Sequence, residues 1–131
     1  MDTNIKTVML IDDNKIDNFF HERAIKKHND DIKVIVYLSA EEALEAIKEN
    51  QSDEVPEVIF LDINMPGMNG WEFLDEYFKL DEKQRKSIVI TMLSTSENPD
   101  DMKTAEERGV SFSSKPLTTE ILNELESKLK P

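Results

Sequence analysis

The sequence predicts a single α/β domain built around a parallel β-sheet. The chain has 131 residues, which is about the length of one domain, and 38% of them are hydrophobic, which is enough to form one core. Five apolar runs rich in strand-forming residues alternate with segments of helical periodicity along the whole length. This alternation is typical of proteins in which helices cover a parallel sheet.

The five apolar runs are the predicted strands, and two of them differ in pattern from the others. The runs cover residues 8–11, 32–37, 58–61, 88–93 and 110–113. Continuous apolar runs predict central strands that are covered on both faces, whereas polar interruptions predict strands with one wetter side. Lys33 interrupts the second run, and Ser111 and Ser113 interrupt the fifth. These two strands are therefore expected at the edges of the sheet.

Four of the five predicted helices have an apolar stripe that predicts a buried face. In the second helix Ser39 is the expected N-cap, and Glu42 follows three residues later as in a capping box. The stripes are Ile16, Phe19, Phe20 and Ala24 in the first helix, Ala40, Ala43, Leu44 and Ile47 in the second, Trp71, Leu74, Tyr77 and Phe78 in the third, and Ile121, Leu122, Leu125 and Leu129 in the last.

The fourth predicted helix has the weakest apolar face. Asn98 is its expected N-cap, Pro99 stands in its first turn, and Gly109 ends it. Only Met102 and Ala105 offer core contacts between these ends. We expect this helix to be the least firmly anchored.

The composition excludes several classes of site and partner. With 16 Lys and Arg against 28 Asp and Glu, the net charge is −12, which would repel nucleic acid. The absence of cysteine excludes disulfides, zinc thiolate sites, iron–sulfur clusters and a cysteine nucleophile. The chain has no signal-peptide pattern at its start and no apolar run of about 18 residues. We expect a soluble cytoplasmic protein that binds neither nucleic acid nor a membrane.

Polar residues follow four of the predicted strands, and they form the candidate site. In an open α/β sheet, the binding site lies at the carboxyl ends of the strands, where the order of connection reverses. The residues at these ends are Asp12 and Asp13 after the first strand, Asp62 after the third, Ser94 and Thr95 after the fourth, and Lys115 and Pro116 after the fifth.

Three of these residues are carboxylates, and like charges that converge raise one another's pKa unless a cation lies between them. Mg²⁺ prefers one or two carboxylates, a carbonyl oxygen and water as ligands. Asp13, Asp62 and a backbone carbonyl of the following loop could supply this set, with Asp12 holding a metal-bound water. As an alternative, Asp12, Asp13 and Asn14 cap the first helix, and one residue could serve both purposes.

Lys115 and Ser94 complete a set of groups that suits a phosphoryl group. A metal ion, an ammonium and a hydroxyl can surround its three equatorial oxygens, and the Asp62 carboxylate can be the nucleophile that forms an aspartyl phosphate. Taken singly, Lys115 with Pro116 is an ordinary surface turn, for which a cis peptide bond is one option, and Ser94 is a loop hydroxyl. Their coincidence with the carboxylates at the strand ends favours the phosphoryl site.

These residues resemble the receiver domains of two-component response regulators, over nearly the whole chain. The resemblance rests on Asp12-Asp13, on the run from Phe60 to Gly70, on Ser94-Thr95 and on Lys115-Pro116. It implies a flavodoxin-like, doubly wound (βα)5 fold, which is a three-layer sandwich with sheet order 2-1-3-4-5. It also implies a single receiver domain over residues 1–131 with no effector domain.

The family pattern implies a role for each matching residue of the site. Asp62 is expected to be the phosphoacceptor. Asp12, Asp13 and Asp62 are expected to bind Mg²⁺, and Asn64 to bind it through its backbone carbonyl. Lys115 is expected to contact the phosphoryl group.

The resemblance also implies a switch and a control of hydrolysis. Ser94 is the expected switch hydroxyl, and Phe112 stands at the position of the switch aromatic. Many members have Tyr there, so a phenolic contact is not available to this protein. Asn64 and Ser96 are the residues expected to tune hydrolysis of the phosphoryl group.

The implied function is that of a response regulator in phosphorelay signal transduction. Its phosphodonor would be a histidine kinase, a histidine phosphotransfer protein, or both. It would promote its own phosphorylation and dephosphorylation and would not be a turnover enzyme. Its output surface would be helix 4, strand 5 and helix 5, facing an output protein, and a homodimer is a further option. The segments 71–74 and 81–86 resemble those of stand-alone receivers found beside phytochrome-type kinases.

Other sites that place a carboxylate after a strand fit less well. A haloacid-dehalogenase-like phosphatase needs a second Asp two residues after the first, where this chain has Asn64. An EF-hand loop that starts at Asp62 would need a Glu at its twelfth position, which is Phe73. An FMN site would need a phosphate-binding loop after the first strand, where Asp12 and Asp13 would repel the phosphate unless a metal intervened. The alternative that stays open is an acidic α/β interaction module with a vestigial, non-phosphorylated site.

Overall fold

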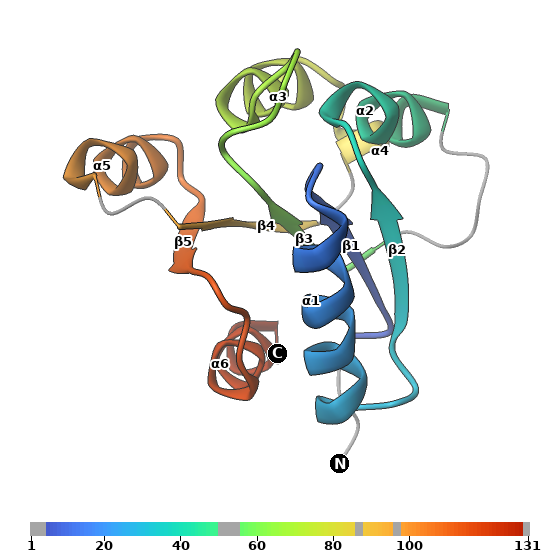
Figure 1. The fold of residues 1–131 in the computed structure, drawn as a ribbon. Helices are drawn as coiled ribbons and strands as arrows, with labels where there is room; N and C mark the ends of the chain where they lie inside the picture. Colours follow the sequence, from blue (N-terminus) through green and yellow to red (C-terminus); the bar gives the residue numbers. More distant parts are fainter. Residues whose placement is uncertain (1–4, 50–55, 86–87, 96–97, 130–131) are drawn as a thin grey trace.

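The structure is a computed structural model that describes residues 5–49, 56–85, 88–95 and 98–129 (Figure 1). Its five strands are β1 (Thr7–Ile11), β2 (Lys33–Tyr37), β3 (Val58–Leu61), β4 (Val89–Ser94) and β5 (Ser111–Ser114). All neighbouring strands pair in parallel, in the order β2-β1-β3-β4-β5. The predicted strand order is therefore confirmed, and so are the two edge strands.

The helices are α1 (Lys15–His28), α2 (Ala40–Glu49), α3 (Gly70–Tyr77), α4 (Glu82–Arg85), α5 (Pro99–Glu107) and α6 (Thr119–Leu129). The short helix α4 was not predicted from the sequence. The fourth and fifth predicted helices therefore correspond to α5 and α6. Asn14, Asn69 and Asn98 cap α1, α3 and α5 with their side chains. Ser39 caps α2 as predicted, because its hydroxyl accepts the Glu42 N–H at 3.2 Å.

The sheet separates two hydrophobic clusters, which gives the predicted three layers. Alternate strand residues such as Ile11 and Leu61 face a cluster that includes core residues of α2, α3 and α5. Their neighbours Leu10 and Phe60 face a second cluster that includes core residues of α1 and α6. Every residue of β1 and β3 is buried, as expected for strands covered on both faces. Among the described helices, none has the length and hydrophobicity needed to cross a membrane.

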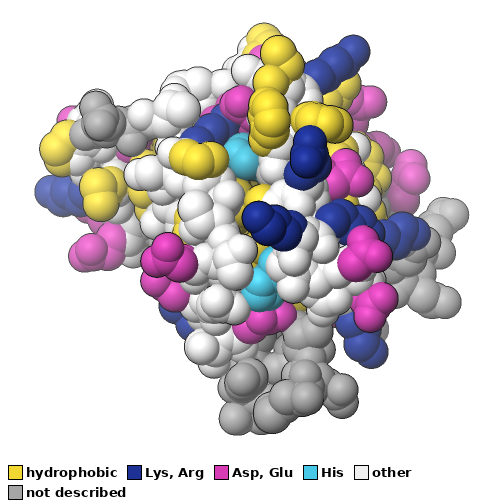
Figure 2. Space-filling model, turned by 60° about the horizontal axis from the view of Figure 1, so that its bottom comes forward, with side chains coloured by type: hydrophobic (Ala, Val, Ile, Leu, Met, Phe, Trp, Pro, Cys, Tyr) yellow, Lys and Arg dark blue, Asp and Glu magenta, His cyan; other side chains and the backbone are white. Residues whose placement is uncertain are grey.

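The predicted buried face of α1 is wrong. Ile16, Phe19 and Phe20 are more than half exposed, and the buried residues of α1 are Asn18, His21 and Ile25. Figure 2 shows one face of the molecule, on which hydrophobic side chains reach the surface next to Lys and Arg side chains. The physical reason is that the inward face of α1 meets the polar ends of the strands, where a hydrogen-bonding side chain is needed.

Two further residues of the predicted stripes point to solvent. Met102 of α5 is 56% exposed, so Ala105 is the residue of this helix that enters the core. The single small side chain confirms that α5 has little anchorage. Phe78 follows the last turn of α3 and is 44% exposed. The side chain of Leu129 lies outside the described residues.

Candidate functional site

The register of the sheet brings the first and third strand ends together. Ile11 pairs with Leu61, so Asp12 and Asp62 follow at the same edge. The backbone N–H of Asp62 donates to the carbonyl of Ile11 at 3.0 Å, and the N–H of Asp12 donates to Tyr37 at 3.1 Å. The two acidic residues are thus fixed by hydrogen bonds that extend the central sheet beyond its strands.

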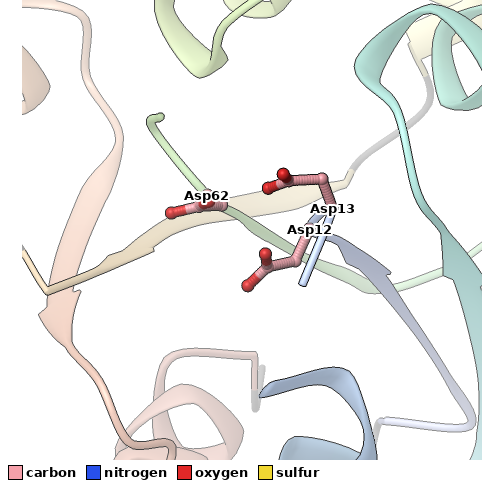
Figure 3. A group of neighbouring side chains, drawn as sticks. All are labelled: Asp12, Asp13 and Asp62. Atoms are coloured by element: carbon pink, nitrogen blue, oxygen red, sulfur yellow. The ribbon is translucent and has the colours of Figure 1, made fainter. Parts of the chain in front are cut away.

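Asp12, Asp13 and Asp62 form a carboxylate cluster. Each offers an oxygen that lies within 4.8 Å of the oxygens of the other two. Figure 3 shows the three side chains extending to the same side from the ends of β1 and β3. Asp12 and Asp62 are buried, whereas Asp13 is exposed. The structure therefore brings together the three carboxylates that the sequence predicted as a metal site.

Asp12 also supports the start of α1, so the capping alternative is correct in part. Asn14 is the residue that caps the helix, because its side chain accepts the N–H groups of Ile16 and Asp17. One oxygen of Asp12 accepts the N–H of Asn14 at 3.0 Å. Its other oxygen accepts from Lys115, so Asp12 joins the helix start to the acidic cluster.

Lys115 reaches the cluster from the end of β5. Its backbone N–H donates to the carbonyl of Ser94 at 2.9 Å, which ties the loop after β5 to the end of β4. Its ammonium donates to Asp12 at 2.7 Å and to Asp17 at 2.8 Å, and lies 3.7 Å from Asp62. The Lys115-Pro116 peptide is cis, as the sequence allowed.

The electrostatics of the site are dominated by burial and by the crowding of negative charge. Burial raises the pKa of Asp62 to about 6, and repulsion from Asp12 adds to the rise, although Lys115 opposes it. Burial would lower the pKa of Lys115, but hydrogen bonds to Asp12 and Asp17 raise it above the ordinary value. Lys115 is therefore a permanent cation, while Asp62 carries an unfavourable negative charge at neutral pH.

Two buried polar residues of α1, Asn18 and His21, lie beside the site, and neither was predicted from the sequence. Asn18 donates to the backbone carbonyl of Asp12 at 2.8 Å, while its side-chain oxygen has no hydrogen-bond partner in the described part of the chain. Burial, and then the charge of Lys115, lower the pKa of His21. Asn18, His21, Asp12 and Asp62 are among the residues that line one small pocket.

A sequence signal for these residues existed. Asn18 and His21 lie three residues apart, and Ile25 follows four residues later, which is the spacing of one helical face. The stripe is visible when it is drawn back from Ile25. Asp17 was missed as well, and its only signal was an acidic residue in the first turn of a helix.

The loop between β3 and α3 is held close to Asp62. The N–H of Gly70 donates to the carbonyl of Ile63 at 2.8 Å. A Cβ at Gly70 would lie 2.5 Å from the carbonyl oxygen of Asp62, so only glycine fits at this distance. Asn64 lies exposed in this loop, two residues after Asp62.

The predicted switch residues lie on neighbouring strands. Ser94 is buried at the end of β4, and Phe112 is partly buried in β5, where it packs against the core cluster of α2, α3 and α5. Met102, Lys103, Ala105, Glu106, Val110 and Phe112 line an open groove of about 490 Å³ between α5 and β5. Ser96, the second residue expected to tune hydrolysis, lies outside the described residues.

The donor set suits a hard divalent cation. The cluster offers only carboxylate oxygens, and one of its members, Asp62, is destabilised as an anion by its surroundings. Mg²⁺ prefers oxygen ligands and keeps several waters, and the exposed Asp13 leaves that side open to water. Asp12, Asp13 and Asp62 therefore fit such an ion.

Comparisons with known proteins identify similar chains. The sequence profile of the response regulator receiver domain matches residues 8–126. Response regulator Rcp1 of Synechocystis sp. is 30% identical over 100 residues, covering 74% of this chain and 67% of that protein. A two component response regulator from Cytophaga hutchinsonii superposes with a TM-score of 0.86 at 34% identity, over 95% of this chain and 96% of that one. The bacteriophytochrome response regulator RtBRR superposes with a TM-score of 0.77 at 25% identity, over 97% and 79% of the two chains.

Proposed function

The chain belongs to the response regulator receiver family of two-component signalling, and we propose that Asp62 is its phosphoacceptor. The observation that supports this most strongly is the position of Asp62. Its carboxylate lies close to two other acidic side chains and to a largely buried ammonium, at the end of a central strand. A carboxylate whose pKa is raised to about 6 is also a stronger base than an ordinary aspartate and is still ionised at neutral pH.

The donor in this proposal is a phosphohistidine of a histidine kinase or of a histidine phosphotransfer protein. An oxygen of Asp62 attacks phosphorus, an O–P bond forms, and the N–P bond of the donor breaks. The imidazole leaves with the bonding electron pair and takes up a proton. Hydrolysis later cleaves the O–P bond by attack of water on phosphorus and restores the carboxylate. In this proposal the protein promotes the phosphorylation and dephosphorylation of its own Asp62. This agrees with the general role of receiver domains, which are signalling proteins and not turnover enzymes.

Mg²⁺ is the cofactor that we propose for this reaction. Asp12, Asp13 and Asp62 would hold it together with the backbone carbonyl of Asn64. When bound, the ion supplies positive charge that offsets the carboxylates and the phosphoryl oxygens. The Lys115 ammonium, which donates to Asp12, supplies a further positive charge. Ser94 is buried at the end of the neighbouring strand β4. We assign Lys115 and Ser94 to contacts with the phosphoryl oxygens.

The output surface in this proposal consists of α5, β5 and α6. A phosphoryl group shifts a conformational equilibrium only if it contacts the two conformations differently, and movement of Ser94 toward it supplies that difference. Phe112 borders the open groove beside α5 and has no hydroxyl to leave unpaired when it turns inward. Because α5 buries only Ala105, it can shift at small cost and present a changed face to an output protein or to a second copy of the chain.

A labelling experiment tests the phosphoacceptor. Wild-type protein is incubated with phosphorylated histidine kinases and, separately, with a small acyl phosphate, with Mg²⁺ or with a strong chelator. We expect label only with Mg²⁺, and none on Asp62→Asn, which is nearly isosteric. The matched control is Asp31→Asn, which removes one exposed charge at the opposite end of the sheet and should be labelled normally. Label that persists on Asp62→Asn at neutral pH, or with the chelator, contradicts the assignment.

The vestigial interaction module is the competing function, and metal binding separates the two. Trp71 is the only tryptophan, and it is the second residue of α3, the helix that follows the loop after Asp62. We expect Mg²⁺ to change its fluorescence in the wild type but not in Asp13→Asn combined with Asp62→Asn. A protein that binds no Mg²⁺ and accepts no phosphoryl group would be the vestigial module.

A further inference from the structure

Asp17 gives the site a fourth carboxylate that the assigned roles do not use. It lies in the first turn of α1, where its backbone N–H donates to the side chain of Asn14 at 3.0 Å. Its carboxylate accepts from the Lys115 ammonium at 2.8 Å. The Lys115 side chain is 10% exposed and that of Asp17 is 32% exposed. The contact is therefore largely shielded from water on the lysine side.

The geometry around Lys115 is asymmetric. The ammonium lies at hydrogen-bond distance from two carboxylates, Asp12 at 2.7 Å and Asp17 at 2.8 Å. Its distance to Asp62 is 3.7 Å, which is too long for a hydrogen bond. An ammonium has three N–H donors, so one donor is left over that could serve Asp62. The two shorter contacts hold the ammonium between the end of β1 and the first turn of α1, at 3.7 Å from Asp62.

We propose that Asp17 is a positioning residue, which holds the Lys115 ammonium away from Asp62 and so leaves the phosphoacceptor carboxylate free for the cation and the phosphoryl group. The inference rests on the proposed function, because it assigns Asp62 as the phosphoacceptor and as a metal ligand. Asp12 alone would not fix the ammonium in the same way, since it is itself a member of the carboxylate cluster and its other oxygen accepts the N–H of Asn14.

The consequence of losing Asp17 follows from electrostatics. Without its charge, Asp62 becomes the second carboxylate within reach of the ammonium, at 3.7 Å in the present structure. Attraction between opposite charges is strong where both partners are nearly buried, so a direct Lys115–Asp62 ion pair is expected to form. That pair would use lone pairs of Asp62 that a metal ion and the attack on phosphorus require. Lysine and metal would then compete for one carboxylate.

The test measures Mg²⁺ affinity by isothermal titration calorimetry for wild type, Asp17→Asn, Lys115→Met and the double variant. When Lys115 is present, we expect Asp17→Asn to weaken Mg²⁺ binding by about fivefold or more. In the Lys115→Met background, we expect the same substitution to weaken it by less than about twofold. Asp31→Asn is the control for loss of one negative charge. Equal losses in both backgrounds would overturn the inference, because Asp17 would then act through its own charge. Circular dichroism and urea midpoints confirm that each variant is folded.

Crystal structures of wild type and Asp17→Asn give the second readout. We expect the distance from Lys115 Nζ to Asp62 to fall below about 3.2 Å in the variant. An ammonium that stays on Asp12 and more than 3.5 Å from Asp62 contradicts the inference. If the wild type binds no Mg²⁺, the metal part of the proposed function fails, while the two crystal structures still decide the role of Asp17.

Discussion

Replacing Asp62 with Asn should stabilise the folded protein at neutral pH. Burial and the neighbouring Asp12 raise the pKa of Asp62 from 3.8 to about 6, so the folded state holds this proton more tightly than the unfolded state does. At about 1.4 kcal/mol per pH unit, ionised Asp62 costs the folded state about 2 to 3 kcal/mol. Asn has nearly the same shape and no charge, so Asp62→Asn removes this cost.

The sign of the pH dependence follows from the same shift. Well below pH 3.8 the carboxyl group is protonated in both states, so the wild type and the variant should have similar stability. As the pH rises from about 4 to about 6, the unfolded state loses its proton first, and the wild type loses stability relative to Asp62→Asn. Above pH 7 the difference should be constant.

Urea unfolding followed by circular dichroism between pH 4 and pH 8 measures this difference. Asp31→Asn serves as the control for net charge and should show no such step. Added Mg²⁺ should stabilise the wild type more than the variant, because a ligand that binds the folded state adds to its stability. If Asp62→Asn is less stable than the wild type at pH 7, or if the gap does not grow with pH, the account of the acidic cluster is wrong.

Three other outcomes are expected. Asn64→Arg should change the lifetime of the label on Asp62 more than it changes the free energy of unfolding, because we expect residue 64 to border the path of the attacking water; an unchanged lifetime contradicts this. Gly70→Ala should cost about 2 kcal/mol or more in urea unfolding, since its Cβ would overlap backbone that cannot move alone; a fully stable variant would show that the loop can shift. A phosphoryl mimic should alter amide hydrogen exchange from Ser94 through Phe112, and changes limited to the loop after Asp62 would defeat the switch.

The sequence predicted the sheet well because its signal is local and strong. The run from Val58 to Leu61 is fully apolar, and a strand of this kind has few environments other than the centre of a parallel sheet. Lys33 on β2 is exposed, as its polar character indicated. Strand ends then converge by topology, so Asp12 and Asp62 could be placed together before any geometry was known.

The same reasoning failed for α1 because hydrophobicity alone does not say which face meets the core. Phe19 and Phe20 are more apolar than Asn18 and His21, yet they lie on the outside, where Phe19 and Phe20 pack edge to face and Arg23 lies over the ring of Phe19. The inner face begins beside Asp12, whose buried carbonyl needs a donor. A hydrogen-bond requirement that arises 6 residues away is not visible in the periodicity of the helix.

The charges of the site explain why one lysine is not enough to satisfy it. The contacts place Asp12, Asp17 and Asp62 around the Lys115 ammonium, and Asp13 completes the acidic cluster. The pKa of Asp62 is still raised to about 6, so the attraction of Lys115 does not offset burial and repulsion. A phosphoryl group would add a charge of about −1.5 to −2 among these residues. In the proposed function, positive charge beyond that of Lys115 would therefore be required before Asp62 could accept the phosphoryl group. We expect the same cluster that lowers the stability of the fold to make phosphorylation depend on a cation.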